Sequence, residues 1–393
     1  MNILPKYKQL QMLQQPLLEH RYNDDLLLRE ENREQAKEEF QSIYHVLDDP
    51  YLRSKFQNVN EQANLAKKHS RNLGLLSVLF GLASLMGASS EAIWENYKWA
   101  ETLAIISGCF GIFAAGIGFF GVMIGDRKTK WLHMRLYTER LRQWYFQTMI
   151  WRISEIAQSL GTDNPDAHNE YRQLRQKWLS GFINEQLNGK IDSMLASILD
   201  ANNPSEPWVH DRHEQQYPKL PQDFEGSEGC AELFAAYRKL RFLEQLGYAN
   251  YMLRETGYSL LSFPLCKQQK LISFIWLMAF TGLVGLHALI LSEHLFKYLP
   301  PLDTPQAQLI VHVSIIWLAL VAIALRTLEE GLTIPHEIER YQEYRANVRN
   351  LLSQFDSAKN AKEKILVMFE MEVVVFEEMR SFLRTNHNAT FVF

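Results

Sequence analysis

The chain has 393 residues, 47% of them hydrophobic, and its 41 Lys and Arg against 45 Asp and Glu give a formal net charge of −4. This balance excludes the strongly basic face typical of nucleic-acid-binding proteins, so no direct nucleic-acid partner is expected. The three cysteines, Cys109, Cys230 and Cys266, have neither the number nor the spacing of a disulfide framework or a zinc site. We expect no metal and no cofactor.

Four uncharged runs dominate the sequence: 72–90, 102–125, 271–292 and 304–325. A hydrocarbon core about 30 Å thick needs about 20 residues of helix, so each run is long enough to span a bilayer. Since the runs fall into two pairs joined by short turns, the sequence predicts an all-α, polytopic membrane protein with four transmembrane helices in two hairpins. The alternative is a set of core helices in a soluble protein, whose apolar runs are usually about 10–14 residues.

The basic residues predict the orientation of these hairpins. They flank the outer ends of both pairs, as Lys67, Lys68 and Arg71, then Arg127, Lys128 and Lys130, then Lys267 and Lys270, and finally Arg326. Each hairpin turn carries one Lys and is net acidic. By the positive-inside rule both chain ends and the central segment should be cytoplasmic, with anionic lipid beside the basic residues.

These boundaries divide the chain into five parts. They are N-terminal cytoplasmic helices (1–71), hairpin 1 (72–125), a cytoplasmic helical region (126–270) with a Pro-rich loop at 202–229, hairpin 2 (271–325) and C-terminal cytoplasmic helices (326–393). Asp48-Asp49-Pro50 should end one N-terminal helix and start another. A helix continued from Thr102 to Leu160 would form a stalk about 88 Å long. A further helix is expected at 166–199, and the Pro-rich loop could act as a hinge or lid.

Glycines recur along hairpin 1. The first span holds Gly74 and Gly81, and the second holds Gly111, Gly118, Gly121 and Gly125. Small residues allow close helix packing in lipid. They predict either a tight hairpin within one subunit, or a contact between subunits or a pore-lining face.

Only His287 and His312 could titrate within the spans. Active transport normally needs intramembrane carboxylates or paired charges, so this composition argues against an ion-coupled transporter. We expect each histidine to hydrogen-bond a neighbouring helix rather than to sense pH.

No catalytic residue is predicted. The sequence His210-Asp211-Arg212-His213-Glu214 does not match the order of a zinc-peptidase motif and lies in the Pro-rich loop. The chain also contains no phosphate-binding glycine loop, nucleophile elbow or plausible triad. We therefore do not expect an enzyme.

Beyond the second span, Trp131, Arg135, Glu139 and Arg142 follow at steps of four, four and three residues. This spacing places them on one helix face, where Glu139 can pair with both arginines. An ordinary surface ion pair of negligible energetic value is the alternative.

The uncharged hairpin, with Ala66, Lys67, Lys68 and Arg71 before it and the Trp131–Arg142 pattern after it, resembles the SLATT family of bacterial two-transmembrane effectors. The resemblance covers about residues 60–150. The second half has Tyr341, Tyr344, Arg345 and Arg349 but lacks a glutamate equivalent to Glu139, so it resembles a duplicated or diverged second hairpin.

The resemblance implies an effector of antiphage defence in the bacterial inner membrane, one that forms pores or disrupts the membrane after a cytoplasmic sensor or signal-producing protein acts. Four spans are too few for a wide channel, so a homo-oligomer would be required. Two alternatives remain open: a membrane-anchored scaffold or sensor that docks a protein partner, and a constitutive channel.

Overall fold

The computed structural model describes residues 24–95, 97, 99–119, 127–160, 165–200, 206–209, 221, 224–254, 264–296 and 304–389. Every regular element within these ranges is a helix, so the predicted all-α class is confirmed. Four helices are long and apolar enough to cross a membrane, as expected for a four-span protein.

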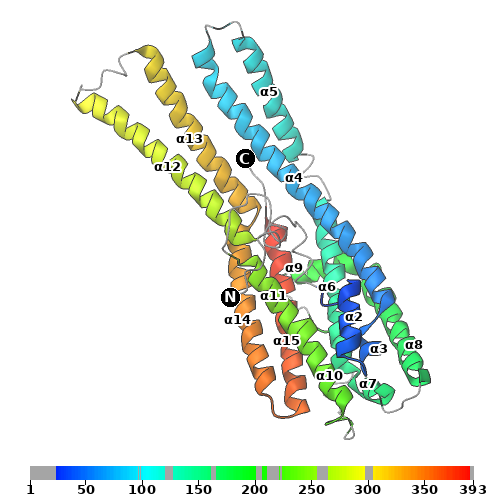
Figure 1. Cartoon of the computed structure of the whole chain (residues 1–393). Helices are drawn as coiled ribbons and strands as arrows, with labels where there is room; N and C mark the ends of the chain where they lie inside the picture. Colours follow the sequence, from blue (N-terminus) through cyan, green and yellow to red (C-terminus); the bar gives the residue numbers. More distant parts are fainter. Residues whose placement is uncertain are drawn as a thin grey trace.

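The four candidate spans form two hairpins. Hairpin 1 consists of α4 (Pro50–Trp94) and α5 (Ala100–Gly116), and hairpin 2 consists of α12 (Leu265–Phe296) and α13 (Pro305–Gly331). Figure 1 shows both hairpins leaving the same end of the molecule. Only 6% of the apolar window in α5, and likewise in α12, is buried within the chain. Large apolar side chains, among them Ile112 and Phe274, are exposed on these two helices, as is typical of surfaces that contact lipid.

The other helices form a bundle at the opposite end, which we call the body (Figure 1). It comprises α2 (Glu30–Glu39), α3 (Tyr44–Leu47), α6 (Arg127–Trp151), α7 (Ile153–Leu160), α8 (Pro165–Phe182), η3 (Ile183–Leu187), α9 (Ile191–Leu199), α10 (Glu228–Tyr237), η4 (Arg238–Leu243), α11 (Glu244–Met252), α14 (Ile334–Ser357) and α15 (Ala361–Asn388), where η marks a π-helical turn. The body buries a large apolar core of its own.

Helix α4 belongs to both parts. Pro50 stands at its first position, and the Asp49 carboxylate accepts a hydrogen bond from the Leu52 amide at 2.9 Å. This cap explains why the predicted break at Asp48-Asp49-Pro50 is confirmed. From there α4 runs unbroken for 45 residues, or about 68 Å. Its first turns bury Leu52 and Phe56 in the body core, and its last turns form hairpin 1.

The predicted stalk differs from the structure. Helix α6 ends at Trp151 and α7 begins at Ile153, so the helix expected to continue to Leu160 is interrupted. Residues 120–126, where α5 would have to join α6, lie outside the described residues. All the side chains of α6 from Thr138 to Ile150 are buried. Helix α6 is therefore the central helix of the body instead of a projecting stalk.

The helix expected over 166–199 is also interrupted. Helix α8 passes into the π-helical turn η3, which ends at Leu187, and α9 starts only at Ile191. Gly189 between them has a φ of +74°, a conformation that glycine adopts without steric cost. Beyond this glycine, α9 packs against α6 and α15.

Candidate functional site

Glu139 lies between two arginines on α6. Its Oε1 is 2.5 Å from Arg135 Nη2 and 2.7 Å from Arg142 Nη1. Burial alone would raise the pKa of Glu139, but the two arginines outweigh it and lower the pKa to about 2. Glu139 and Arg142 are buried, so this cluster is not the ordinary surface ion pair that the sequence left open.

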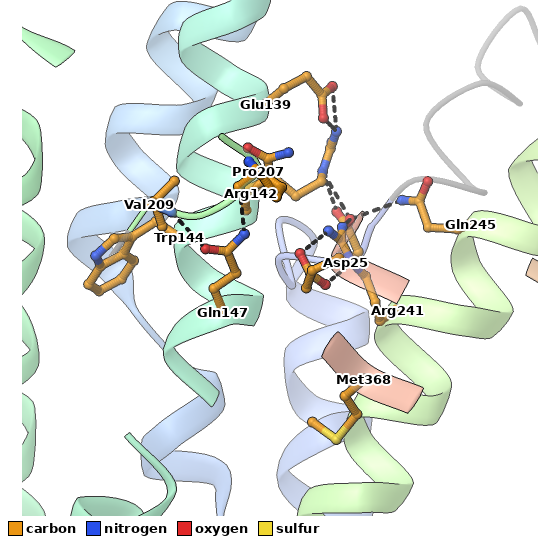
Figure 2. Close-up of polar contacts among 12 residues, drawn as sticks. Asp25, Glu139, Arg142, Trp144, Gln147, Pro207, Val209, Arg241, Gln245 and Met368 are labelled. Carbon is orange, nitrogen blue, oxygen red and sulfur yellow. Dashed lines mark hydrogen bonds and ion pairs between the residues drawn. The ribbon is translucent and has the colours of Figure 1, made fainter. Parts of the chain in front are cut away.

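The cluster continues to residues far away in the chain (Figure 2). Arg142 Nε lies 2.9 Å from Asp25 Oδ2, and Arg241 Nη2 lies 2.7 Å from Glu372 Oε2. Arg241 Nη1 reaches within 3.8 Å of Asp25 as well. We call these residues, with Arg135 and Glu139, the ion network. Its three guanidinium groups balance its three carboxylates, and this pairing offsets part of the cost of removing the charges from water.

Neutral side chains complete the network. The Tyr237 hydroxyl donates to Glu372 Oε1 at 2.8 Å, and Gln245 Nε2 donates to Asp25 Oδ2 at 3.1 Å. The Tyr344 hydroxyl in turn donates to Gln245 Oε1 at 3.0 Å. The network thereby joins the segment before α2 to α6, α10–α11, α14 and α15.

Local backbone features aim two of these charges inward. Asp24 accepts hydrogen bonds from the amides of Leu28 and Arg29, and this turn carries Leu27 at a φ of 53° and holds Asp25 at the core. Arg241 lies in the π-helical turn η4, with its guanidinium 4.2 Å from the centre of the Phe146 ring. Such turns often mark functional positions in helices.

The remaining stalk candidates are placed differently. Trp131 is buried and packs edge-on against Phe382, 5.7 Å between ring centres, so it joins α6 to α15. Arg345 is half-buried, and Arg349 is exposed with its Nη2 3.4 Å from Asn250 Oδ1. In the second half the buried ion pair is instead made by Arg340, whose Nη2 lies 2.7 Å from Glu337 Oε2.

Small residues lie at the contact between the two helices of hairpin 1. A Cβ at Gly111 would lie 2.8 Å from Ser84 Oγ, and one at Gly118 would lie 3.3 Å from Ser77 Oγ. The Ser107 hydroxyl donates to the Ser84 carbonyl at 2.6 Å, and the Ser77 hydroxyl donates to the Ala114 carbonyl at 3.2 Å. These two glycines therefore lie at the contact between α4 and α5. Gly121 and Gly125 lie outside the described residues.

The other face of α4 meets hairpin 2, and we call this contact the hairpin joint. Val78 packs with Ala324 and Leu328 of α13. Gly74 and Gly81 are buried on α4, each three or four residues from both Val78 and Ser77. Further out, Trp317 Nε1 of α13 donates to the Met86 carbonyl and to Ser90 Oγ, both at 3.1 Å. The joint is thus made by apolar side chains and by hydrogen bonds from Trp317.

The intramembrane histidines bond locally. His287 Nδ1 lies 2.9 Å from the Leu283 carbonyl, and His312 Nδ1 lies 2.7 Å from the Gln308 carbonyl. Both rings are exposed on the surface of the chain. Our expectation of hydrogen bonds to a neighbouring helix was wrong, because the carbonyl four residues earlier on the same helix lies within reach.

Comparison with protein-family models, with curated proteins and with solved structures found no significant match. The described residues contain no group of three or more His, Cys, Asp or Glu placed to hold a metal ion. The segment His210–Glu214 lies outside the described residues. The candidate functional elements are therefore the ion network of the body and the hairpin joint.

Proposed function

We propose that this chain is a homo-oligomeric effector of a bacterial inner membrane, with both termini in the cytoplasm, in which a cytoplasmic signal acts on the body and changes how the two hairpins pack. In the changed arrangement the assembled spans perturb the membrane or conduct ions. The antiphage context of the proposal comes from the SLATT resemblance alone.

The observation that carries the proposal is the rigid connection between body and membrane. Helix α4 is continuous from its cap at Asp49 to Trp94, and only Leu332 and Thr333 separate α13 from α14. A helix transmits rotation and translation along its length, whereas a protein that is merely anchored needs only a flexible tether. A rearrangement of the ion network would thus be transmitted through these helices to the hairpin joint.

The two hairpin contacts also differ in a way that supports this mechanism. Within hairpin 1, glycine and serine bring the backbones close and hydrogen bonds join α4 to α5. Between the hairpins, larger side chains make the contact: Val78 packs with Ala324 and Leu328, and Trp317 donates hydrogen bonds to Met86 and Ser90. Hairpin 1 is therefore suited to move as a unit, with the joint as the place of movement.

An oligomer is part of the proposal because a single chain cannot enclose a water-filled path. The apolar windows of the spans are largely exposed, which leaves broad faces for lipid and for further copies. Rotating the hairpins within a ring of copies would exchange the faces that line its centre.

Uncoupling the body from the spans tests the proposal against a scaffold function. A Gly-Ser-Gly insertion after His69 breaks the continuity of α4 between body and hairpin, and the same insertion in the turn between α4 and α5 is the matched control. Membrane potential in a bacterial host is followed by a potential-sensitive dye after induction.

Because the proposed effector responds to a signal, both insertions are also made in the Glu372→Gln chain, in which the loosened ion network stands in for that signal. We expect depolarisation by Glu372→Gln and by Glu372→Gln with the control insertion, and none by Glu372→Gln with the insertion after His69 at equal abundance in the membrane. A Glu372→Gln chain that reaches the membrane and leaves the potential unchanged would refute the effector function. Equal depolarisation by both insertions would refute the coupling through α4.

A further inference from the structure

Arg140 on α6 differs from the other arginines buried in the body. Among the described residues, five arginines are buried: Arg140, Arg142, Arg175, Arg241 and Arg340. Four of them face a carboxylate, in the pairs Arg142–Asp25, Arg175–Asp49, Arg241–Glu372 and Arg340–Glu337. Arg140 makes no ion pair of this kind with any described residue. A buried charge without a countercharge is costly, so its retention needs a reason.

Arg140 makes one hydrogen bond of ordinary length among the described residues, and its guanidinium lies 5.8 Å from the centre of the Phe376 ring. Arg140 is only 5% exposed, and its Nη1 donates to Gln143 Oε1 at 2.9 Å. Nη1 lies 3.4 Å from the Pro207 carbonyl oxygen and Nη2 lies 3.5 Å from the Trp208 carbonyl oxygen, and Nε has no hydrogen-bond partner among the described residues. Burial lowers the pKa of Arg140 to about 10, although Glu206 acts in the opposite direction.

Two glutamines extend this set of donors along α6. Gln143 is buried, and its Oε1 accepts from Arg140, which places its amide group beside the guanidinium. Within the part of the chain that the structure describes, Gln143 Nε2 has no hydrogen-bond partner. Gln147 donates to the Pro207 carbonyl at 3.0 Å and accepts from the Val209 amide at 2.9 Å (Figure 2). Residues 140, 143 and 147 are three and four apart, so they share one helix face.

We propose that Arg140, Gln143 and Gln147 form a binding site for a small phosphate-bearing anion, which residues 206–209 cover in this structure. The site presents N–H donors from three side chains and one formal positive charge. A phosphate group has enough acceptor oxygens to satisfy several such donors at once, and guanidinium is well matched to it. The anion would supply a countercharge in direct contact with the guanidinium, in addition to the more distant carboxylate of Glu206.

The covering segment is held in a way that allows exchange. The Trp208 ring packs edge-on against Trp151 and Phe369, at 6.0 and 5.3 Å between centres, and Gln147 binds the backbone on either side. The bonds that an anion must replace are the long contacts from Arg140 to the carbonyls of Pro207 and Trp208. The segment can therefore release the guanidinium while its tryptophan stays anchored.

The position of the site indicates a soluble anion. Arg140 lies about 20 Å along α6 from its first residue, Arg127, which follows the second span. A phospholipid headgroup held at the bilayer surface does not extend that far. Anion binding here holds whether or not the hairpins permeabilise a membrane, so the inference stands apart from the proposed function.

Binding of inorganic phosphate and pyrophosphate to the purified full chain in detergent micelles tests the site. Calorimetric titration and thermal unfolding are run at constant ionic strength, set with chloride. We expect saturable binding with one site per chain. At a free anion concentration ten times Kd, the ratio of folded to unfolded protein should rise about elevenfold.

Arg140→Met should abolish this binding, and Arg349→Met, which removes an exposed arginine on α14, should leave it unchanged. Without anion, Arg140→Met should unfold at the same temperature as the native chain or higher, because it removes an uncompensated buried charge. A merely structural arginine would give a clear loss of stability. If Arg140→Met does not fold, Gln143→Leu provides the second variant, with an expected loss of at least tenfold in affinity.

Three results would overturn the proposal. One is phosphate and pyrophosphate stabilising the native chain no more than chloride does. Another is native affinity in Arg140→Met or Gln143→Leu. The third is stronger binding of succinate than of either phosphate probe, because it would assign the site to carboxylates.

Discussion

Arg241 and Glu372 form a two-point ion pair that is wholly shielded from solvent. Arg241 Nε and Nη2 donate to Glu372 Oε1 and Oε2 at 2.8 and 2.7 Å, and both side chains are 0% exposed. The pair joins η4 to α15, 131 residues apart in the chain. Because neither charge can reach water, each depends on the other.

This dependence predicts a strong energetic coupling. Arg241→Met should lower the free energy of unfolding by about 3–5 kcal/mol, since it leaves a buried carboxylate uncompensated. Arg241→Met combined with Glu372→Met should be less destabilising than the sum of the single changes. Denaturant unfolding of the detergent-purified protein measures the four free energies. Additive losses would contradict the role assigned to the pair.

Glu244 predicts a pH dependence with a definite sign. Burial, with Asp25 adding to it, raises the pKa of Glu244 from 4.5 to about 7. A raised pKa means that the folded state favours the protonated form, so this stabilising contribution is present below about pH 4.5 and lost as the pH rises through 7. Glu244→Gln should therefore be more stable than the native chain at about pH 8, with the difference shrinking towards pH 5.

Unfolding midpoints measured across this pH range check the Glu244 prediction. Glu339→Gln removes an exposed carboxylate on α14 and serves as the control, with no expected pH-dependent difference. A Glu244→Gln variant that is less stable than the native chain at about pH 8 would show that the carboxylate is stabilising when charged.

Two glycines of α5 provide a matched pair for hairpin 1. Gly111→Leu places a Cβ 2.8 Å from Ser84 Oγ, whereas a Cβ at Gly108 meets nothing within 4 Å. We expect Gly111→Leu to cost about 1–3 kcal/mol through overpacking and to abolish depolarisation by the Glu372→Gln chain. Gly108→Leu should change neither property. If Gly111→Leu is tolerated in both assays, close packing of hairpin 1 is not needed for function.

Much of the architecture is predictable from local sequence, because long uncharged runs, basic flanks and the Asp49-Pro50 helix start act through neighbouring residues. The same locality explains the Arg135–Glu139–Arg142 cluster, whose members share one helix face.

The rest of the network could not be predicted because tertiary packing creates it. Asp25, Arg241 and Glu372 meet across more than a hundred residues of chain. The only sequence signal is a charge at a position flanked by large apolar residues, as Arg241 is by Leu240 and Phe242. Spacing alone also favoured Arg345 and Arg349 over Arg340, since it does not show which helix face is buried.

We propose that the body controls the permeability of the membrane through the hairpin joint. Potassium efflux from liposomes containing the purified chain tests this most directly. Glu372→Gln loosens the ion network of the body, and Val78→Cys with Ala324→Cys allows the joint to be locked by a disulfide. We predict that Glu372→Gln raises efflux above that of the native chain, that the disulfide suppresses this increase and that a reductant restores it. Efflux from every variant equal to that of protein-free liposomes would contradict the claim.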